Sequence, residues 1–178
     1  MQTKMLIGGA LVPGEGAPEA ILDPTTAETI AIVNEASFAR LESRNCGKPP
    51  ARALEDELPP IIDCFRFFAG AARCRPATAA GEYLAGFTSM VRRDPIGVVA
   101  SIAPWNYPLM MAAWKLAAAL AAGNTVVLKP SEQTPLTALK LATIMGEIFM
   151  AGVVNVVPGR GETVGAPLVA MAACAWSR

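Results

Sequence analysis

The 178-residue sequence has no histidine and no net charge, since 15 basic residues balance 15 acidic ones. Without histidine, Ser-His-Asp and Cys-His catalysis within the chain and most zinc sites are excluded. The charge balance gives no reason to expect binding to nucleic acid or to an anionic membrane surface. CxxC pairs are also missing, because the four cysteines stand at positions 46, 64, 74 and 174. Reduced thiols and a cytoplasmic location are therefore expected.

Uninterrupted apolar stretches of membrane-spanning length are absent as well. The segment Ile96–Gly123 has a single charged residue, Lys115, but Pro104 and Pro108 interrupt it around Asn106. The helix that remains, about 15 residues, is shorter than the ~20 residues that cross a bilayer. A buried helix of an α/β protein is the better interpretation of this segment than a membrane span.

The same region contains the clearest pattern in the sequence. Val98–Ile102 is a short apolar run typical of a buried strand, and Pro108 suits the first turn of a helix. Leu109–Ala122 is rich in alanine, leucine and methionine and stops before a Gly-Asn pair that is typical of a helix end. Thr125–Leu128 is a second β-branched strand. Strand, helix and strand in this order predict a parallel βαβ unit.

The flanking segments predict further elements. Before the βαβ unit we expect a hairpin of Met5–Val12 with Ile30–Val33, a helix over Leu54–Arg73 and an edge strand over Thr88–Asp94. The helix has apolar residues at helical spacing, which predicts that Ile61, Phe65 and Phe68 are core residues.

After the βαβ unit, Leu136–Phe149 is predicted to be a helix capped by Ser131 or Thr134, and Val153–Val157 a third strand. Gly159–Gly165 then has the pattern GxGxxxG, one residue longer than the dinucleotide-binding fingerprint. Glycine-rich turns are common after strands, but the position of this one favours a loop on the cofactor side.

Two segments, APWNYPLMMAAWK and GNTVVLKPSEQTPLTAL, resemble the aldehyde dehydrogenase superfamily, and most closely its γ-aminobutyraldehyde branch. The resemblance extends from the N-terminus to about Leu168, with two family helices missing at Ser37-Phe38 and a divergent tail at 169–178. It implies an α/β, partial aldehyde dehydrogenase fold, in which an N-terminal hairpin, a helix and an edge strand precede a parallel, Rossmann-like βαβαβ half. The implied division is an N-terminal and oligomerisation-type part (1–95), a partial NAD-binding domain (96–168) and the tail.

The resemblance also implies roles for individual residues. Asn106 is the expected catalytic residue, donating its amide N–H to the oxyanion of a thiohemiacetal. The alternative is an asparagine that only holds its turn. The expected cofactor is NAD, with the candidate binding residues Ile102, Ala103, Pro104, Trp105, Lys129, Pro130, Ser131, Glu132, Gly161 and Gly165.

Lys129 and Glu132 carry the preference for NAD. At the carboxyl end of a parallel strand, a carboxylate can accept both ribose hydroxyls of the adenosine half, and it would repel a 2′-phosphate. The preference is therefore for NAD over NADP. The alternative is a solvated ion pair on the surface.

The candidate substrate residues are Tyr107, Met111 and Trp114. Tyr107 and Trp114 are seven residues apart, so both rings can lie on one face of a helix and attract a cationic amine. This arrangement suits an aminoaldehyde such as 4-aminobutanal. The alternative is that both rings only pack in the core.

None of the four cysteines stands in the nucleophile motif of the family, and the segments with the nucleophile, the base and the pyrophosphate site lie outside the resemblance. We therefore expect weak or partial NAD binding and no turnover by this chain alone. Three hypotheses remain: a truncated NAD-dependent aldehyde dehydrogenase, a non-catalytic nucleotide-binding or subunit-interaction module, and a pseudogene product. The expected partners are an aldehyde and further subunits, identical or different, with no nucleic acid, membrane or metal.

Overall fold

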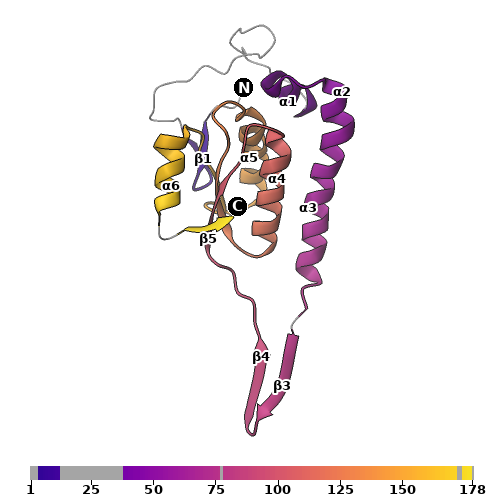
Figure 1. Ribbon diagram of the computed structural model, residues 1–178, viewed down its shortest axis with the longest axis vertical. Coiled ribbons are helices and arrows are strands. Elements are labelled where there is room, and N and C mark those ends of the chain that lie inside the picture. Colours follow the sequence, from indigo (N-terminus) through magenta and orange to yellow (C-terminus); the bar gives the residue numbers. More distant parts are fainter. Residues whose placement is uncertain (1–3, 13–37, 77, 172–173, 178) are drawn as a thin grey trace.

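A six-stranded sheet forms the body of the protein, and the computed structural model describes residues 4–12, 38–76, 78–171 and 174–177 (Figure 1). The strand order is β2-β1-β7-β6-β5-β8. The strands of this sheet are β1 (Met5–Ile7), β2 (Ala10–Val12), β5 (Val98–Ile102), β6 (Thr125–Lys129), β7 (Val154–Val156) and β8 (Cys174–Ser177).

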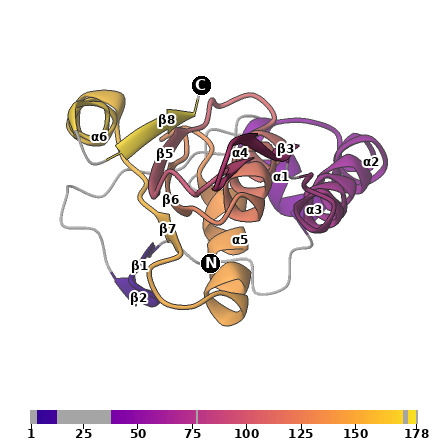
Figure 2. The same cartoon turned by 90° about the horizontal axis from the view of Figure 1, so that it is seen from below.

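The centre of the sheet is parallel, as the sequence predicts. Strand β5 pairs with β6 from Val98↔Thr125 to Ile102↔Lys129, and β6 pairs in the same sense with β7. The connecting helices are α4 (Pro108–Ala121) and α5 (Leu136–Ile148). Both helices lie on one face of the sheet, and the short helix α6 (Ala166–Ala170) lies on the other (Figure 2). The predicted βαβαβ unit is confirmed.

The main core lies between this sheet and the two connecting helices. Leu128 of β6 and Leu116 of α4 are 0% and 1% exposed, respectively, and Val126, Leu139 and Val156 are also buried in this cluster. Burying one such side chain stabilises the fold by about 1.5–3 kcal/mol, which fixes the two helices on the sheet.

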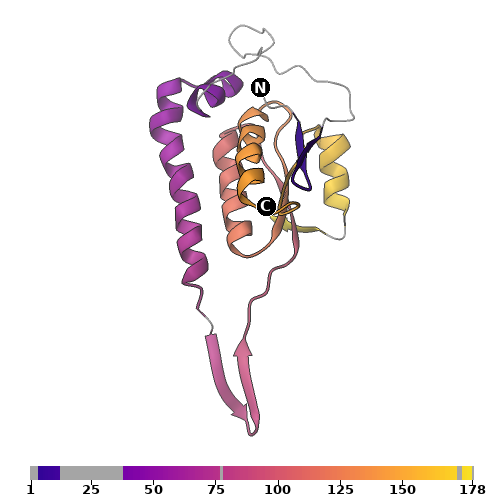
Figure 3. The same cartoon turned by 180° about the vertical axis from the view of Figure 1, so that it is seen from behind.

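A second helical layer covers α4 from outside (Figure 3). It consists of α1 (Phe38–Cys46), α2 (Pro50–Arg52), the π-helical turn η1 (Ala53–Glu57) and α3 (Leu58–Arg73). A small cluster of Ile61, Leu109 and Ala113 joins α3 to α4.

Helix α3 differs from its prediction in two ways. It begins at Leu58 rather than at residue 54, and Pro59 and Pro60 occupy its first turn, where a missing N–H costs nothing. Of the predicted core residues only Ile61 is buried, whereas Phe65 and Phe68 are half-buried. The reason is geometric, because α3 packs mainly against α4 and the rest of its surface faces away from the body.

The hairpin of β3 (Thr78–Leu84) and β4 (Phe87–Val91) projects from the body as a separate two-stranded sheet (Figure 1). Strand β4 ends at Val91, three residues before the predicted end of the edge strand. The hairpin has exposed apolar side chains on Tyr83, Leu84, Phe87 and Met90.

The N-terminal hairpin is not the predicted one. Met5–Val12 forms two strands, β1 and β2, because Gly8 and Gly9 make a two-residue turn with φ of 58° and 80°. Consecutive residues with positive φ form the turn type whose twist suits a hairpin, and glycine adopts it without strain. Strand β1 joins the main sheet antiparallel to β7. The predicted partner Ile30–Val33 and the Ser37 side of the predicted gap lie outside the described residues.

Near the C-terminus, β8 is an additional strand that the sequence analysis did not predict. It pairs in parallel with β5 from Val98↔Cys174 to Ser101↔Ser177. Strand preference depends strongly on context, and here the pairing with the edge of β5 defines the strand. Among the described residues, no helix combines the length and the apolar character that crossing a membrane requires.

Candidate functional site

Two loops meet where the parallel strands β5 and β6 end. One loop follows Ile102 and contains Trp105, and the other follows Lys129 and contains Thr134. The Thr134 hydroxyl donates a hydrogen bond to the Trp105 carbonyl at 3.1 Å, which ties the loops together. The Ala103 N–H donates to the Lys129 carbonyl at 3.0 Å, so the pairing of the strands extends to this edge. In open α/β sheets, this edge is where ligands bind.

Lys129 and Glu132 form an ion pair here, with 2.8 Å between Lys129 Nζ and Glu132 Oε2. The Lys129 side chain is only 4% exposed, whereas that of Glu132 is 35% exposed. The hydrogen bond from Lys129 lowers the pKa of Glu132, and the charge of Arg160 acts in the same direction. A buried cation thus holds an ionised, accessible carboxylate in place, unlike a solvated surface pair. Pro130 and Ser131 are buried between the two residues.

The glycine pattern after β7 lies beside this edge. Gly161–Gly165 forms the π-helical turn η2, and a side chain at Gly165 would come within 4.0 Å of Ile102 Cδ1. Gly159 has φ +146°, and a Cβ there would collide with the side chain of Val164, so glycine is required at this position. The structure therefore brings the predicted cofactor residues of three strand ends to one edge of the sheet.

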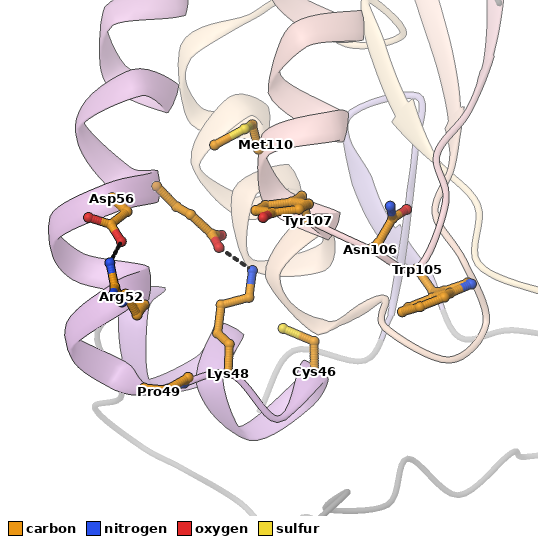
Figure 4. Close-up of a pocket in the computed structure, with 10 residues that line it drawn as sticks. Cys46, Lys48, Pro49, Arg52, Asp56, Trp105, Asn106, Tyr107 and Met110 are labelled. Atoms are coloured by element: carbon orange, nitrogen blue, oxygen red, sulfur yellow. Dashed lines mark hydrogen bonds and ion pairs between the residues drawn. The ribbon is translucent and has the colours of Figure 1, made fainter.

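Asn106 belongs to the loop that follows Ile102 and lines a pocket of about 570 Å³ (Figure 4). The next residue, Tyr107, has φ 51° and is the only non-glycine residue with positive φ in the described part of the chain. Such a conformation costs on the order of 1–3 kcal/mol and persists only where the surroundings enforce it. The pocket is lined by Cys46, Lys48, Pro49, Arg52, Asp56, Glu57, Trp105, Asn106, Tyr107 and Met110.

A charged cluster that the sequence analysis missed forms the opposite wall of the pocket. Lys48 Nζ lies 4.7 Å from the centroid of the Tyr107 ring (Figure 4). The same ammonium group forms an ion pair with Glu57 and lies 3.6 Å from Glu42 Oε1. One face of the Tyr107 ring is therefore already occupied by an ammonium group of the protein. The Glu57 Oε2 atom is buried and has no hydrogen-bond partner among the described residues.

The sequence does contain a signal for this cluster. Phe38, Leu41, Glu42 and Asn45 have the spacing of one helix face, so an acidic and an amide side chain share a face with apolar residues. Buried polar groups of this kind need partners elsewhere in the fold. The pattern therefore indicates that Glu42 and Asn45 make specific polar contacts, but it does not identify the residues that they contact.

Cys46 also lines the pocket but is a poor nucleophile. Its thiol donates a hydrogen bond to the Glu42 carbonyl at 2.8 Å. Burial, and next the negative charge of Glu42, raise the pKa of Cys46 to about 11. The reactive thiolate is therefore almost absent at neutral pH.

Two predicted substrate residues lie outside the set that lines this pocket. Trp114 is half-exposed on α4, and Met111 packs against the main core. Trp105 is 61% exposed, and its ring extends away from Lys48 (Figure 4). Among the described residues, no cluster of three or more cysteine or acidic side chains could hold a metal ion.

Glu42 gives the stability of this region a testable pH dependence. Burial raises the pKa of Glu42 above 4.5, against the lowering effects of the Thr137 hydroxyl, the Leu109 N–H and Lys48, and the charge of Glu57 adds to the increase. The folded state therefore binds more protons than the unfolded state just above pH 4.5, so the Glu42 contribution to stability is lost as the pH rises through its folded pKa. We expect Glu42→Gln to remove this loss, so that the urea midpoint of the variant rises relative to that of the wild type as the pH increases above 4.5.

Glu132→Gln is the matched control, because the pKa of Glu132 is lowered and its contribution has the opposite sign. This variant should be less stable than the wild type above pH 4.5, and the difference should shrink as the pH falls below that value. Parallel urea midpoints for Glu42→Gln and wild type across this range would contradict the assignment.

The candidate site thus lies at the carboxyl edge of a parallel α/β sheet, the edge where such folds bind ligands. The loop after β6 holds the fixed carboxylate of Glu132, and the loop after β5 holds the amide of Asn106. The sequence pattern of the aldehyde dehydrogenase family matches residues 20–175, and the chain belongs to this family. It is 50% identical over 138 residues to an aldehyde dehydrogenase of Vibrio cholerae, an alignment that covers 78% of this chain and 26% of that protein. With retinaldehyde dehydrogenase 3 of Mus musculus the identity is 51%, over 76% of this chain and 26% of that protein.

Solved structures show the same relationship. The NAD⁺ complex of an aldehyde dehydrogenase from Bacillus cereus superposes with a TM-score of 0.89 at 30% identity, over 98% of this chain and 45% of that one. The chain thus spans about a quarter of the length of the curated relatives and less than half of this neighbour. The predicted superfamily and fold class are confirmed. The family pattern also includes most of the tail that the sequence analysis treated as divergent.

Proposed function

We propose that this chain is the part of an NAD-dependent aldehyde dehydrogenase that binds the adenosine half of NAD and supplies the oxyanion donor. The observation that carries the proposal is the ion pair in which buried Lys129 fixes the accessible carboxylate of Glu132 at the carboxyl edge of β6. A carboxylate held in this way can accept hydrogen bonds from two adjacent ribose hydroxyls. Similar solved structures include PnpE in complex with nicotinamide adenine dinucleotide and the NAD⁺ complex of an aldehyde dehydrogenase from Bacillus cereus, which supports the choice of cofactor.

In aldehyde oxidation, NAD supplies the hydride acceptor, and the protein must supply a thiolate, a base and an oxyanion donor. Asn106, exposed in the pocket, is the donor that this chain offers. Cys46 is unsuited as the thiolate because its pKa is about 11. We therefore expect the purified 178-residue chain to produce no NADH from 4-aminobutanal or from simple aldehydes.

Nucleotide binding tests the proposal directly. Calorimetry on the purified chain should show AMP and NAD binding with similar, weak affinity, because Lys129 and Glu132 contact only the adenosine ribose. Glu132→Ala should weaken both by at least 10-fold, since hydrogen bonds to a charged group contribute about 1.5–3 kcal/mol each. Glu147→Ala, which removes an exposed carboxylate from the last turn of α5, is the matched control and should leave both affinities unchanged. Absence of AMP binding, or NAD binding much tighter than AMP binding, would refute this assignment.

For the substrate we propose an aminoaldehyde such as 4-aminobutanal. The pocket beside Asn106 is lined by Glu57, whose carboxylate is an acceptor for an ammonium group and has one oxygen without a hydrogen-bond partner in the described part of the chain. Lys48 stands between Glu42 and Glu57, so two carboxylates face one cation and the cluster favours additional positive charge. Lys48 already covers one face of the Tyr107 ring. We therefore expect Glu57 and half-exposed Trp114 to contribute more than Tyr107 to binding the ammonium group of the substrate.

Substrate choice can be tested in a complete enzyme. The aldehyde dehydrogenase of Vibrio cholerae would carry residues 38–148 of this chain, which end with α5, in place of its own equivalent segment. In this chimera, Glu57→Gln and Trp114→Ala should each lower kcat/KM for 4-aminobutanal about 5- to 30-fold more than for a neutral aldehyde of equal length, as expected for the loss of ~1–2 kcal/mol of cation binding. Equal losses for both substrates would mean that these residues only pack.

The hairpin β3–β4 favours a second role, in subunit contacts. Its exposed Tyr83, Leu84, Phe87 and Met90 form an apolar surface on an element that projects from the body. We propose that this surface contacts another subunit, identical or different, and that the protein is cytoplasmic. A non-catalytic interaction module would use the same hairpin, but it would not need the Lys129–Glu132 pair.

A further inference from the structure

Helix α1 presents two buried polar side chains to the body of the protein. Glu42 is 2% exposed and Asn45 is 4% exposed, and their separation of three residues puts both on one face. In the described structure, α1 lies beside the N-terminal ends of α4 and α5 (Figure 3). These helix ends follow the two loops of the candidate site.

Glu42 caps α4 from outside that helix. Its Oε1 accepts a hydrogen bond from the N–H of Leu109, the second residue of α4, at 3.3 Å. The N-cap position of α4 is Tyr107, which makes no side-chain cap of its own. A carboxylate at a helix N-terminus is also favoured by the helix dipole. Glu42 therefore satisfies a buried N–H that the local sequence cannot.

Asn45 caps the N-terminus of α5 in the same way, and both its amide oxygen and its amide nitrogen take part. Its Oδ1 accepts from the N–H of Leu136, the first residue of α5, at 3.0 Å. Its Nδ2 donates to the carbonyl of Gln133 at 3.2 Å. The predicted caps Ser131 and Thr134 are wrong, since Pro135 holds the N-cap position without a side-chain cap. Ser131 Oγ instead accepts from the Gln133 N–H, and Thr134 donates to Trp105.

The two caps act on the residues that would meet substrate and cofactor. Leu109 lies three residues after Asn106, and between them Tyr107 is held with positive φ. Gln133 directly follows Glu132. Within the described part of the chain, Glu42 and Asn45 are the side-chain acceptors for the Leu109 and Leu136 N–H groups, so α1 fixes the ends of both loops.

We propose that Glu42 and Asn45 are positioning residues, through which one helix fixes the oxyanion-donor loop and the ribose-binding loop relative to each other. The functional half of this inference rests on the proposed function. The two loops belong to different strands, and the Thr134–Trp105 hydrogen bond alone joins them directly in the contacts described above. Helix α1 adds a common anchor with three hydrogen bonds from two side chains.

The test uses the full 178-residue chain and compares Asn45→Ala with Asn155→Ala. Asn155 is a matched control because its amide likewise bonds only to backbone groups: Asn45 makes two such hydrogen bonds, and Asn155 makes three, with Gly8, Val126 and Gly152. Two quantities are measured at equal folded fraction: hydrogen exchange at the Leu136 N–H and the affinity for AMP. The first N–H groups of a helix have no partner within the helix, so their protection reports the cap directly.

We expect Asn45→Ala to accelerate exchange at Leu136 at least 5-fold and to weaken AMP binding at least 3-fold, whereas Asn155→Ala changes neither. Glu42→Ala should accelerate exchange at Leu109, and Glu42→Gln, which keeps an acceptor oxygen, should restore it. Equal effects of the Asn45 and Asn155 variants would show that Asn45 only stabilises the fold and would overturn the proposal.

Two further outcomes are distinguishable. If the wild type fails to bind AMP, the proposed function is refuted, and exchange at Leu109 and Leu136 still decides whether the caps hold the loops. If Asn45→Ala does not fold, Asn45→Asp replaces it, because aspartate keeps the acceptor for Leu136 and loses the donor to Gln133. That variant should weaken AMP binding with exchange at Leu136 unchanged, and unaltered AMP affinity would overturn the link to Glu132.

Discussion

Replacing Asn106 by alanine in the chimeric enzyme should lower kcat by about 10²–10³-fold with little change in KM. Loss of one oxyanion donor has an effect of this size because the hydrogen bond strengthens as negative charge develops on the reacting oxygen. In the structure, Asn106 lies in the pocket next to Tyr107, whose positive φ fixes the direction in which the loop enters α4. Steady-state kinetics with a saturating aldehyde measure the effect.

The control for this prediction is Gln133→Ala in the neighbouring loop, since Gln133 is exposed and uses its backbone rather than its side chain in the contacts described. Gln133→Ala should leave kcat within about 2-fold of the parent. A rise in KM at unchanged kcat for Asn106→Ala would instead assign Asn106 to the turn alone, the alternative that the sequence left open.

The central part of the fold could be predicted because its signals are local. The apolar run of β5, the proline at the start of α4 and the glycine after its end are each readable within a few residues, and the structure confirms their order and their ends to within one or two residues. Parallel pairing then follows from the strand–helix–strand order. The position of Lys129 and Glu132 at the carboxyl edge is a consequence of the same local pattern.

The remaining features depend on contacts between distant segments. Glu42 and Asn45 bind helix N–H groups that lie 67 and 91 residues later, respectively, and no local pattern identifies such partners. Lys48 reaches Tyr107 across a similar separation, and β8 becomes a strand by pairing with β5. In the N-terminal hairpin the missed signal was local, because Gly8-Gly9 is a two-residue turn within a run that resembles one strand.

Leu128→Ala should have the largest effect on stability, a loss of about 2–5 kcal/mol. Leu128 is completely buried in β6, where it lies opposite Ser101 of β5 and Val156 of β7, so the strands on both sides restrict collapse of the cavity. It also directly precedes Lys129, so the cavity would loosen the cation that holds Glu132 in place. Chemical denaturation followed by tryptophan fluorescence measures the loss, and AMP affinity at equal folded fraction should fall as well.

Leu84→Ala is the matched control, because it removes the same atoms from a side chain that is 65% exposed on the projecting hairpin. An exposed substitution of this kind should change the free energy of unfolding by no more than about 0.5 kcal/mol. Similar losses for the two variants would mean that the hairpin, rather than the centre of the sheet, limits the stability of the chain. If only Leu128→Ala greatly lowers the free energy of unfolding, the centre of the sheet limits the stability of the chain. The same part of the sheet would then provide the rigid support that the Lys129–Glu132 pair requires.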